Sequence, residues 1–245
     1  MGHHLPFSFD LNPTPQEGQM LEIDESLRET EPDCREGSEI KPFLLRHPAR
    51  ADLETLVALA NSPALTKNLC SNWLPISADG AKSWYLNQTE KTDPTEFPFI
   101  ITNMTGALIG VICLQLEEDR KQAEVSVIIK RDHWQHGYAT RAIQAVADFA
   151  FSSPNMNQPN LEALVARCRV SCGASRRIAE KCGFQYSGTG MAHSQHYKGM
   201  IPIDRYRLDR GVWSALRNWS GMGQRDMFSF GPNSGPDIYG MKGAA

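Results

Sequence analysis

The sequence predicts an α+β fold in which a mixed, mostly antiparallel sheet is flanked by helices. Segments 97–102 and 107–116 read as strands joined by Asn103 to Gly106, which is typical of a hairpin because glycine readily adopts positive φ. The β-branched segment 123–130 passes through a polar turn into an apolar helical pattern. A further strand, helix and hairpin follow, so antiparallel pairs and a strand-helix-strand unit share one sheet.

Hydrophobic periodicity orders the remaining elements. Asp52 is expected to cap the first helix, because a short polar side chain there accepts a hydrogen bond from a free helix amide. Gly183 is well placed to stop a later helix. The expected elements are a strand at 40–46, helices at 53–60 and 77–88, a strand at 161–170, a helix at 174–182 and a closing hairpin of 185–191 and 201–208.

The chain divides by composition into one domain with two extensions. Residues 1–37 are acidic and poor in apolar side chains, which indicates a flexible N-terminal extension. Residues 38–219 carry all the periodic elements and form the predicted domain. Residues 220–245 are Gly-rich and are interpreted as a tail rather than as a second domain.

Charge and hydropathy exclude several classes of protein. The net charge of −3 over 245 residues argues against a nucleic-acid binder that neutralises phosphates. No apolar run approaches the roughly 20 residues that cross a bilayer, and the start lacks the basic region of a secretory signal. Neither nucleic acid nor membrane is therefore an expected partner.

The six cysteines include no Cys-x-x-Cys pair, so reduced thiols in a cytoplasmic protein are the simplest account. A zinc site can be imagined, but its spacing matches no common zinc module, and no metal is expected. The residues of that imagined site are Cys168, Cys172, Cys182, His193 and His196.

The turn after segment 123–130 is a candidate anion site. A strand that enters a helix through small residues leaves the first helix amides without partners, and these amides suit a pyrophosphate. Gly137 and Ala139 let phosphate oxygens approach the backbone. The competing interpretation is an ordinary β-to-α turn, since neither a P-loop nor a three-glycine dinucleotide motif is present.

Two stretches resemble the GNAT acetyltransferase superfamily, in particular its Rim branch of ribosomal-protein N-terminal acetyltransferases. The first is Trp134-x-x-Gly137-Tyr138-Ala139-Thr140, which follows Ala123-Glu124-Val125 and is similar to the acyl-CoA pyrophosphate loop. The second is Cys172 to Phe184, which is similar to a family stretch at the same distance after that loop. The resemblance spans roughly residues 40–213.

The resemblance implies a GNAT fold in which strand 123–130 splays from strand 161–170 and acetyl-CoA, the co-substrate, enters between them. A backbone amide near Val127 to Ile129 would stabilise the oxyanion. The implied cofactor-binding residues are Val127, Ile128, Ile129, Gln135, His136, Gly137, Tyr138, Ala139, Thr140, Cys172, Ser175 and Arg176.

Three residues are candidates for catalysis, each with an alternative. Glu124 is a general base, or it bonds an arginine or the backbone to stabilise the splayed sheet. Cys172, where the family usually has Asn, is a proton donor to the CoA thiolate or a filler. Ser175 contacts the pantetheine or caps the helix. Ala179 replaces the tyrosine that many members use as the general acid.

Other polar and aromatic side chains near these stretches keep two interpretations. Arg176 reaches the nucleotide phosphates or stays solvated on the helix surface. Trp73 and Trp84 line the acceptor pocket or belong to the core. His193, His196 and Tyr197 are expected in the connection between the closing strands, which lines the acceptor pocket in family members or forms a surface loop.

The sequence thus predicts a cytoplasmic acetyl-CoA-dependent N-acetyltransferase that acts on a primary amine, either a peptide N-terminus or a small molecule. A homodimer is a further expectation. One alternative is a non-catalytic acyl-CoA-binding module. Another is a polyamine or antibiotic acetyltransferase, which predicts an acidic acceptor pocket.

Overall fold

A computed structural model of the chain describes residues 9–10, 42–66, 74–90, 95–152, 161–194 and 196–219. Most of the acidic extension 1–37, the tail 220–245 and Trp73 lie outside these residues. Within the extension, Phe9 and Asp10 form a short strand that pairs with the start of the domain.

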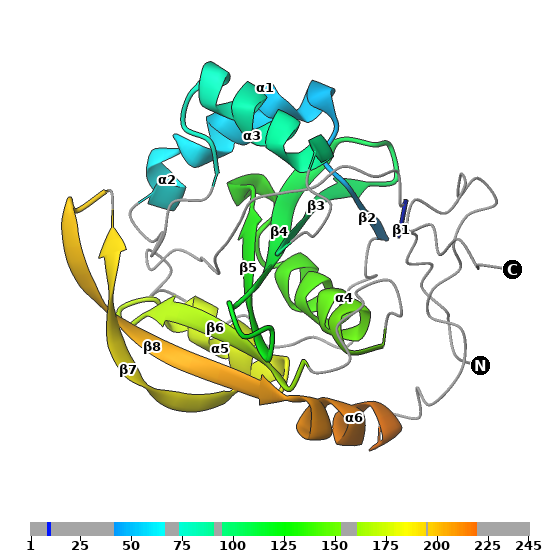
Figure 1. Cartoon of the computed structure of the whole chain (residues 1–245), viewed down its shortest axis with the longest axis vertical. Coiled ribbons are helices and arrows are strands. Elements are labelled where there is room, and N and C mark those ends of the chain that lie inside the picture. The colour runs from blue at the N-terminus through cyan, green and yellow to red at the C-terminus, as the bar shows by residue number, and fades with distance from the viewer. Residues whose placement is uncertain are drawn as a thin grey trace, which may run out of the picture.

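Eight strands form one sheet in the order β1-β2-β3-β4-β5-β6-β8-β7 (Figure 1). The β1/β2 and β5/β6 pairs are parallel and the others are antiparallel, which confirms the predicted mixed sheet. The strands are β1 (Phe9–Asp10), β2 (Phe43–Arg46), β3 (Glu96–Asn103), β4 (Leu108–Leu116), β5 (Gln122–Ile129), β6 (Ala163–Arg169), β7 (Gln185–Ser194) and β8 (Gly199–Asp209).

The predicted helices are confirmed, and four short or terminal ones are added to them. The additions are two 3-10 turns, a four-residue helix at 63–66 and a last helix at 210–219. The helical elements are η1 (Arg50–Asp52), α1 (Leu53–Ala60), α2 (Pro63–Thr66), α3 (Ala78–Glu90), η2 (Arg131–His133), α4 (Tyr138–Ser152), α5 (Gly173–Lys181) and α6 (Arg210–Trp219). None of the helices in the described residues is long and apolar enough to span a bilayer.

Two hydrophobic cores cover the two faces of the sheet. One core packs α4 and α5 against the sheet and takes Val125, Val127 and Ile129 from β5. The other packs α1 and α3 together with the β7–β8 hairpin, and it takes Ile128 from β5. Because successive strand residues point to opposite faces, Glu124 belongs with Ile128 on the α1 and α3 side. Burial on both faces explains the nearly continuous apolar run of β5.

The central strands β5 and β6 diverge, as the resemblance implied. Their parallel pairing holds at three positions, Gln122–Ala163, Ala123–Leu164 and Glu124–Val165. Beyond Glu124, β5 pairs with β4 on its other edge, up to Ile129 opposite Gly110. Figure 1 shows β5 and β6 running in different directions.

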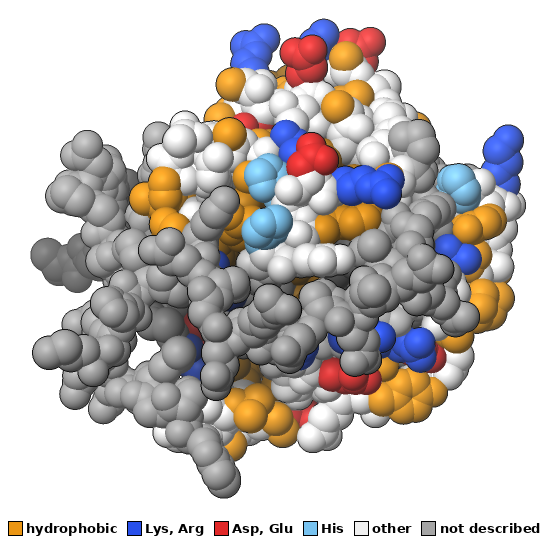
Figure 2. Space-filling view, turned by 180° about the vertical axis from the view of Figure 1, so that it is seen from behind, with side chains coloured by type: hydrophobic (Ala, Val, Ile, Leu, Met, Phe, Trp, Pro, Cys, Tyr) orange, Lys and Arg blue, Asp and Glu red, His pale blue; other side chains and the backbone are white. Residues whose placement is uncertain are grey.

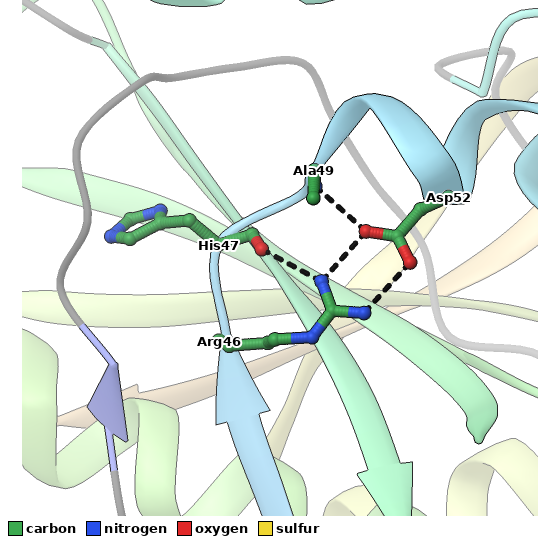
Figure 3. Close-up of polar contacts among 4 residues, drawn as sticks. All are labelled: Arg46, His47, Ala49 and Asp52. Atoms are coloured by element: carbon green, nitrogen blue, oxygen red, sulfur yellow. Dashed lines mark hydrogen bonds and ion pairs between the residues drawn. The ribbon is translucent and has the colours of Figure 1, made fainter. Parts of the chain in front are cut away.

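The prediction that Asp52 caps the first helix is wrong. Asp52 precedes α1, but its side chain makes no capping hydrogen bond to that helix. Its carboxylate instead accepts two hydrogen bonds from the Arg46 guanidinium, at 2.6 and 2.7 Å, and one from the Ala49 amide at 2.7 Å (Figure 3). The bidentate pair with Arg46 gives the carboxylate two charge-assisted hydrogen bonds and links the end of β2 to the residue before α1.

The last helix, α6, is held against α4 by one buried carboxylate. Trp213 Nε1 donates to Asp148 Oδ1 at 2.9 Å, and Arg217 Nη1 lies 3.0 Å from Asp148 Oδ2. Burial raises the pKa of Asp148 to about 6, although Arg217 and Trp213 act in the opposite direction. Arg210 adds a hydrogen bond to the Phe151 carbonyl at 2.7 Å. These contacts close the domain at its C-terminal end.

The close approach of β4 to β5 at Gly110 leads to a prediction about stability. A Cβ at this position would overlap the Ile128 carbonyl oxygen and lie 2.8 Å from Ile129 Cδ1. Gly110→Ala is therefore expected to lower the free energy of unfolding by about 2 kcal/mol, because backbone must move. Urea denaturation followed by circular dichroism measures the change.

Gly211→Ala is the matched control, since a Cβ at that helical position meets nothing within 4 Å. This control is expected to leave stability unchanged or raise it by up to about 1 kcal/mol. Equal losses in the two variants would contradict the close approach.

Candidate functional site

The divergence of β5 from β6 leaves one edge of β5 without a neighbouring strand in the described structure. Val127, Ile128 and Ile129 lie in this part of the strand and are buried, and their register partners are on β4. A backbone amide on the other edge has no ladder partner from β6. An amide of this kind is suited to bind a developing oxyanion, because it is fixed in position before the reaction.

The candidate phosphate loop lies at the C-terminal end of β5. It runs from η2 through residues 134–137 into the first turn of α4. Gln135 and Gly137 both have positive φ, 61° and 73°, so the chain turns sharply twice before the helix begins. The first helical hydrogen bond runs from the Arg141 amide to the Gly137 carbonyl at 3.1 Å. The amides before Arg141 accordingly lack intrahelical partners.

The loop is open where a ligand would approach it. Gln135, His136 and Gly137 are exposed, and a Cβ at Gly137 would meet nothing within 4 Å. Tyr138 and Ala139 are buried and pack into the α4 core, so their backbone rather than their side chains is available to a ligand. This geometry fits the predicted anion site better than an ordinary turn packed against its neighbours.

Trp134 fastens the loop to the end of β5. Its indole Nε1 donates to the Ile129 carbonyl at 2.7 Å, and its ring packs against both cores. The Trp134 carbonyl in turn lies 2.6 Å from His136 Nδ1. The imidazole of His136 is therefore engaged with the loop's own backbone. In the sequence, Trp134 is only the first residue of the stretch that resembles the GNAT pyrophosphate loop, and nothing there predicts this anchoring role.

Figure 2 shows the molecule from the opposite side to Figure 1, and on this face basic, acidic and apolar side chains are interspersed.

Two arginines lie near the loop and the start of α5. Arg141 follows the loop on α4 and lies over the Phe43 ring, 4.7 Å from its centroid. Burial lowers the pKa of Arg141 from its usual value. Arg176, predicted to reach the phosphates, has its Nη1 3.9 Å from Asp204 Oδ2 on β8.

Cys172 and Ser175 meet at the start of α5. Both are buried, and Cys172 Sγ lies 3.2 Å from Ser175 Oγ. Cys172 is the residue that precedes the helix, and its side chain makes no capping hydrogen bond. Ala179, where many family members have tyrosine, is fully buried in the α4 and α5 core.

Glu124 is nearly inaccessible and is paired through one oxygen only. Its side chain is 4% exposed, and Oε2 forms an ion pair with Arg167 Nη2. Its other oxygen, Oε1, is buried and has no hydrogen-bond partner in the described structure. Burial raises the pKa of Glu124 to about 7; Glu117 also raises it, and Arg167 lowers it. Such a carboxyl exchanges protons near neutral pH, as a general base requires.

A pocket of about 500 Å³ opens beside Glu124. Gln115 on β4 reaches from this pocket to Glu96 on β3, to which its Nε2 donates a hydrogen bond of 2.6 Å. The lining combines four carboxylates with a single guanidinium, so the pocket favours a cation. The lining residues are Gln115, Leu116, Glu117, Glu118, Asp119, Glu124 and Arg167.

The sequence did not single out Arg167 or Ser126 as site residues, whereas Trp84 was expected either in the acceptor pocket or in the core. Ser126, two residues beyond Glu124 on the same strand face, has a buried hydroxyl without a partner in the described structure. Trp84 lies in the α1 and α3 core, and its buried Nε1 has no partner there either. A charged residue at an alternating position of a buried strand was the only available signal for Arg167.

The remaining candidates lie apart from this pocket's lining. His193 is in β7 rather than in the connection between the closing strands. Tyr197, in that connection, packs on His196 with ring centroids 4.7 Å apart and lies under the Arg169 guanidinium. The described cysteines 113, 168, 172 and 182 are free thiols. Among the described residues, no three His, Cys, Asp or Glu side chains gather as a metal site would require.

A family model described as an acetyltransferase (GNAT) domain matches residues 43–185, more than half of the chain. This match confirms the resemblance to the GNAT superfamily, but it does not single out the Rim branch. Two curated bacterial proteins also match in part. The uncharacterized N-acetyltransferase p20 of Bacillus licheniformis is 32% identical over 90 residues, which cover 36% of this chain and 48% of that protein.

The second curated relative is the uncharacterized protein YkkB of Bacillus subtilis (strain 168), 33% identical over 87 residues, or 35% of this chain and 48% of that protein. The chain spans about half the length of the curated relatives that it matches.

Solved structures of spermidine N-acetyltransferase from Vibrio cholerae share the fold. The structure in complex with CoA and spermine has a TM-score of 0.60 at 20% identity, over 70% of this chain and 98% of that one. Another, in complex with manganese ions, has a TM-score of 0.56 at 20% identity, over 74% and 97%. At such identities the likeness establishes the architecture, with its diverging central strands.

The open glycine of the loop leads to a prediction about cofactor binding. Gly137→Asp is expected to weaken the affinity for CoA about 100-fold or more, because a carboxylate would then face the pyrophosphate. Isothermal titration calorimetry with CoA measures this affinity.

Gly106→Asp is a closely matched control. Gly106 also has positive φ, 83°, and open space around its Cβ position, but it lies in the β3–β4 turn. Its substitution introduces the same charge and a similar backbone strain, and CoA affinity should be retained. Unchanged affinity in Gly137→Asp, or an equal loss in both variants, would refute the loop assignment.

Proposed function

The chain belongs to the GNAT acetyltransferase family, and from this premise we propose that it is an acetyl-CoA-dependent N-acetyltransferase acting on a primary amine. The observation that carries the proposal is the parting of β5 from β6 directly after Glu124. This places a free strand edge, an open amide loop and a buried carboxylate of near-neutral pKa along a single strand.

In this proposal the amides of residues 135–140 hold the cofactor's pyrophosphate, aided by the N-terminal end of α4. The pantetheine arm lies between β5 and β6, and the thioester carbonyl points to an amide in residues 127–129. The amine nitrogen attacks that carbonyl carbon, the C–S bond breaks, and the CoA thiolate takes up a proton. Cys172 remains a candidate donor for that proton, with the filler role as its alternative.

Glu124 is the proposed general base. Its free oxygen accepts a proton from the bound ammonium, directly or through a water molecule, and so leaves a nucleophilic amine. At neutral pH about half of the Glu124 side chains are ionised, since the pKa is about 7. A non-catalytic acyl-CoA-binding module would have no use for a buried carboxylate oxygen without a partner, which is costly to fold.

The acceptor that fits best is a small amine with more than one positive charge, such as a polyamine. Four carboxylates line the pocket beside Glu124, and its single cation is already paired with Glu124. A second ammonium group on the acceptor would lie against Glu117, Glu118 and Asp119. Similarity in fold to spermidine N-acetyltransferases supports this choice over the Rim-type peptide N-terminus.

Two expectations from the sequence remain part of the proposal. A cytoplasmic location agrees with the free thiols of the described cysteines. A homodimer would be formed through an exposed surface, and β7 is the last strand at one edge of the sheet.

The role of Glu124 leads to a prediction about pH. The turnover number at saturating amine should rise about tenfold per pH unit below pH 7 and level off above it, because the base must be ionised. Glu124→Gln should lower this turnover number at pH 8 about 100-fold or more and remove the inflection. Release of CoA thiol from acetyl-CoA and spermidine gives the rate.

Glu162→Gln is the control for Glu124→Gln. Glu162 is also paired with a cation, Lys121, but it is exposed and outside the pocket lining. Its substitution should leave the pH profile in place. A Glu124→Gln enzyme as active as the wild type would exclude Glu124 as the base.

The acidic lining leads to a separate prediction about the acceptor. The double variant Glu117→Gln with Glu118→Gln should raise the KM for spermidine about tenfold, because two carboxylates that face its distal ammonium are lost. The KM for a monoamine of similar length should change little. Equal changes for both amines would argue that the pocket does not bind the second charge.

A further inference from the structure

Arg167 joins β6 back to β5 at the point where the two strands part. The last register pair is Glu124 with Val165, and Arg167 stands two residues further along β6 on the same face as Val165. Its Nη2 nevertheless contacts Glu124 Oε2. The ion pair therefore crosses the start of the divergence on the side of the sheet where the acidic pocket opens.

We infer that Arg167 is a positioning residue for the general base: it holds Oε2 of Glu124 and leaves Oε1 to face the acceptor amine or its bridging water. This inference rests on the proposed function of Glu124. Two observations point to it independently of titration: Oε1 is buried and has no partner in the described structure, and both residues line one pocket.

Arg167 also affects the pKa of Glu124 through its positive charge. The groups that face Glu124 or line its pocket are otherwise acidic or neutral. Glu117, Glu118 and Asp119 come from the β4–β5 turn, Cys113 acts from β4, and Glu96 lies behind Gln115. Arg167 is the one cation in the pocket lining, and it lowers the pKa of Glu124 against burial. Arg207 on β8 lies on the same face of the sheet, but it is engaged with Gln122 and Asp209. Without Arg167, the carboxyl would be protonated at neutral pH.

The two partners differ in burial, and this separates function from stability. The Arg167 side chain is 41% exposed, whereas that of Glu124 is 4% exposed. Removal of Arg167 leaves a carboxyl that becomes neutral by taking up a proton, so no uncompensated buried charge remains. The fold and CoA binding should then survive, while the base is lost at neutral pH.

The test compares Arg167→Met with Arg167→Lys in the full chain, using turnover with acetyl-CoA and saturating spermidine between pH 5.5 and 9.5. Arg167→Met should move the inflection upward by about one pH unit or more, because the opposite charge is gone. Its turnover at pH 7 should fall about fivefold or more, in proportion to the ionised fraction, and recover toward the wild-type value at pH 9. Arg167→Lys keeps the charge and should keep the inflection near that of the wild type.

CoA affinity, measured by calorimetry, should be the same in both variants and the wild type. An unmoved inflection in Arg167→Met would overturn the inference, and so would an equal shift in Arg167→Lys. If Arg167→Met does not fold, Arg167→Gln takes its place, with the same upward shift expected. An unshifted Arg167→Gln profile would likewise overturn the inference.

A readout without turnover separates this inference from the proposed function. The carboxyl carbon of Glu124, labelled with ¹³C and assigned through Glu124→Gln, can be titrated by NMR. A pKa that rises in Arg167→Met supports the positioning role even if spermidine is not the acceptor. An unchanged Glu124 titration contradicts it, whatever the enzyme acetylates. A wild-type enzyme that turns over no amine would count against the proposed function alone.

Discussion

The parting of two parallel strands is the constraint on which the rest of this structure depends. As long as β5 pairs with β6, through Glu124, their backbone amides are used by the sheet. Beyond that residue, β5 keeps only β4 as its strand neighbour, and the close approach of Gly110 holds the two together. A buried strand edge without a partner is costly unless a ligand or solvent satisfies it. The chain belongs to the GNAT family, and we propose that its thioester cofactor enters at this point.

The proposed phosphate loop and the proposed base, Glu124, lie at opposite ends of a single strand, β5. Trp134 ties the loop to the carbonyl of Ile129, so the amides of the loop are fixed relative to β5. At the opposite end, burial raises the pKa of Glu124 and Arg167 lowers it, so that the pKa lies at about 7. Both ends owe their properties to the backbone of β5, which is rigid because both of its faces are buried.

The sequence predicted most of the fold, because its elements are strongly periodic and are separated by glycines and polar turns. The helix 53–60 is found as predicted, and so is the turn at Gly137. Asp52 was assigned to the wrong partner because Arg46, six residues earlier in the chain, competes for its carboxylate. The positive φ of Gln135 was not expected, because in a sequence only glycine clearly indicates that backbone conformation. The contact of Arg167 with Glu124 depends on where β5 and β6 part, and no local sequence pattern indicates that position.

The most direct measurement is a crystal structure of the protein with acetyl-CoA or a non-reactive analogue of it. We expect the pantetheine arm between β5 and β6, the thioester carbonyl against an amide of residues 127–129, and the diphosphate on the amides of residues 135–140. A cofactor bound elsewhere, or strands that pair beyond Glu124 and exclude it, would refute this arrangement.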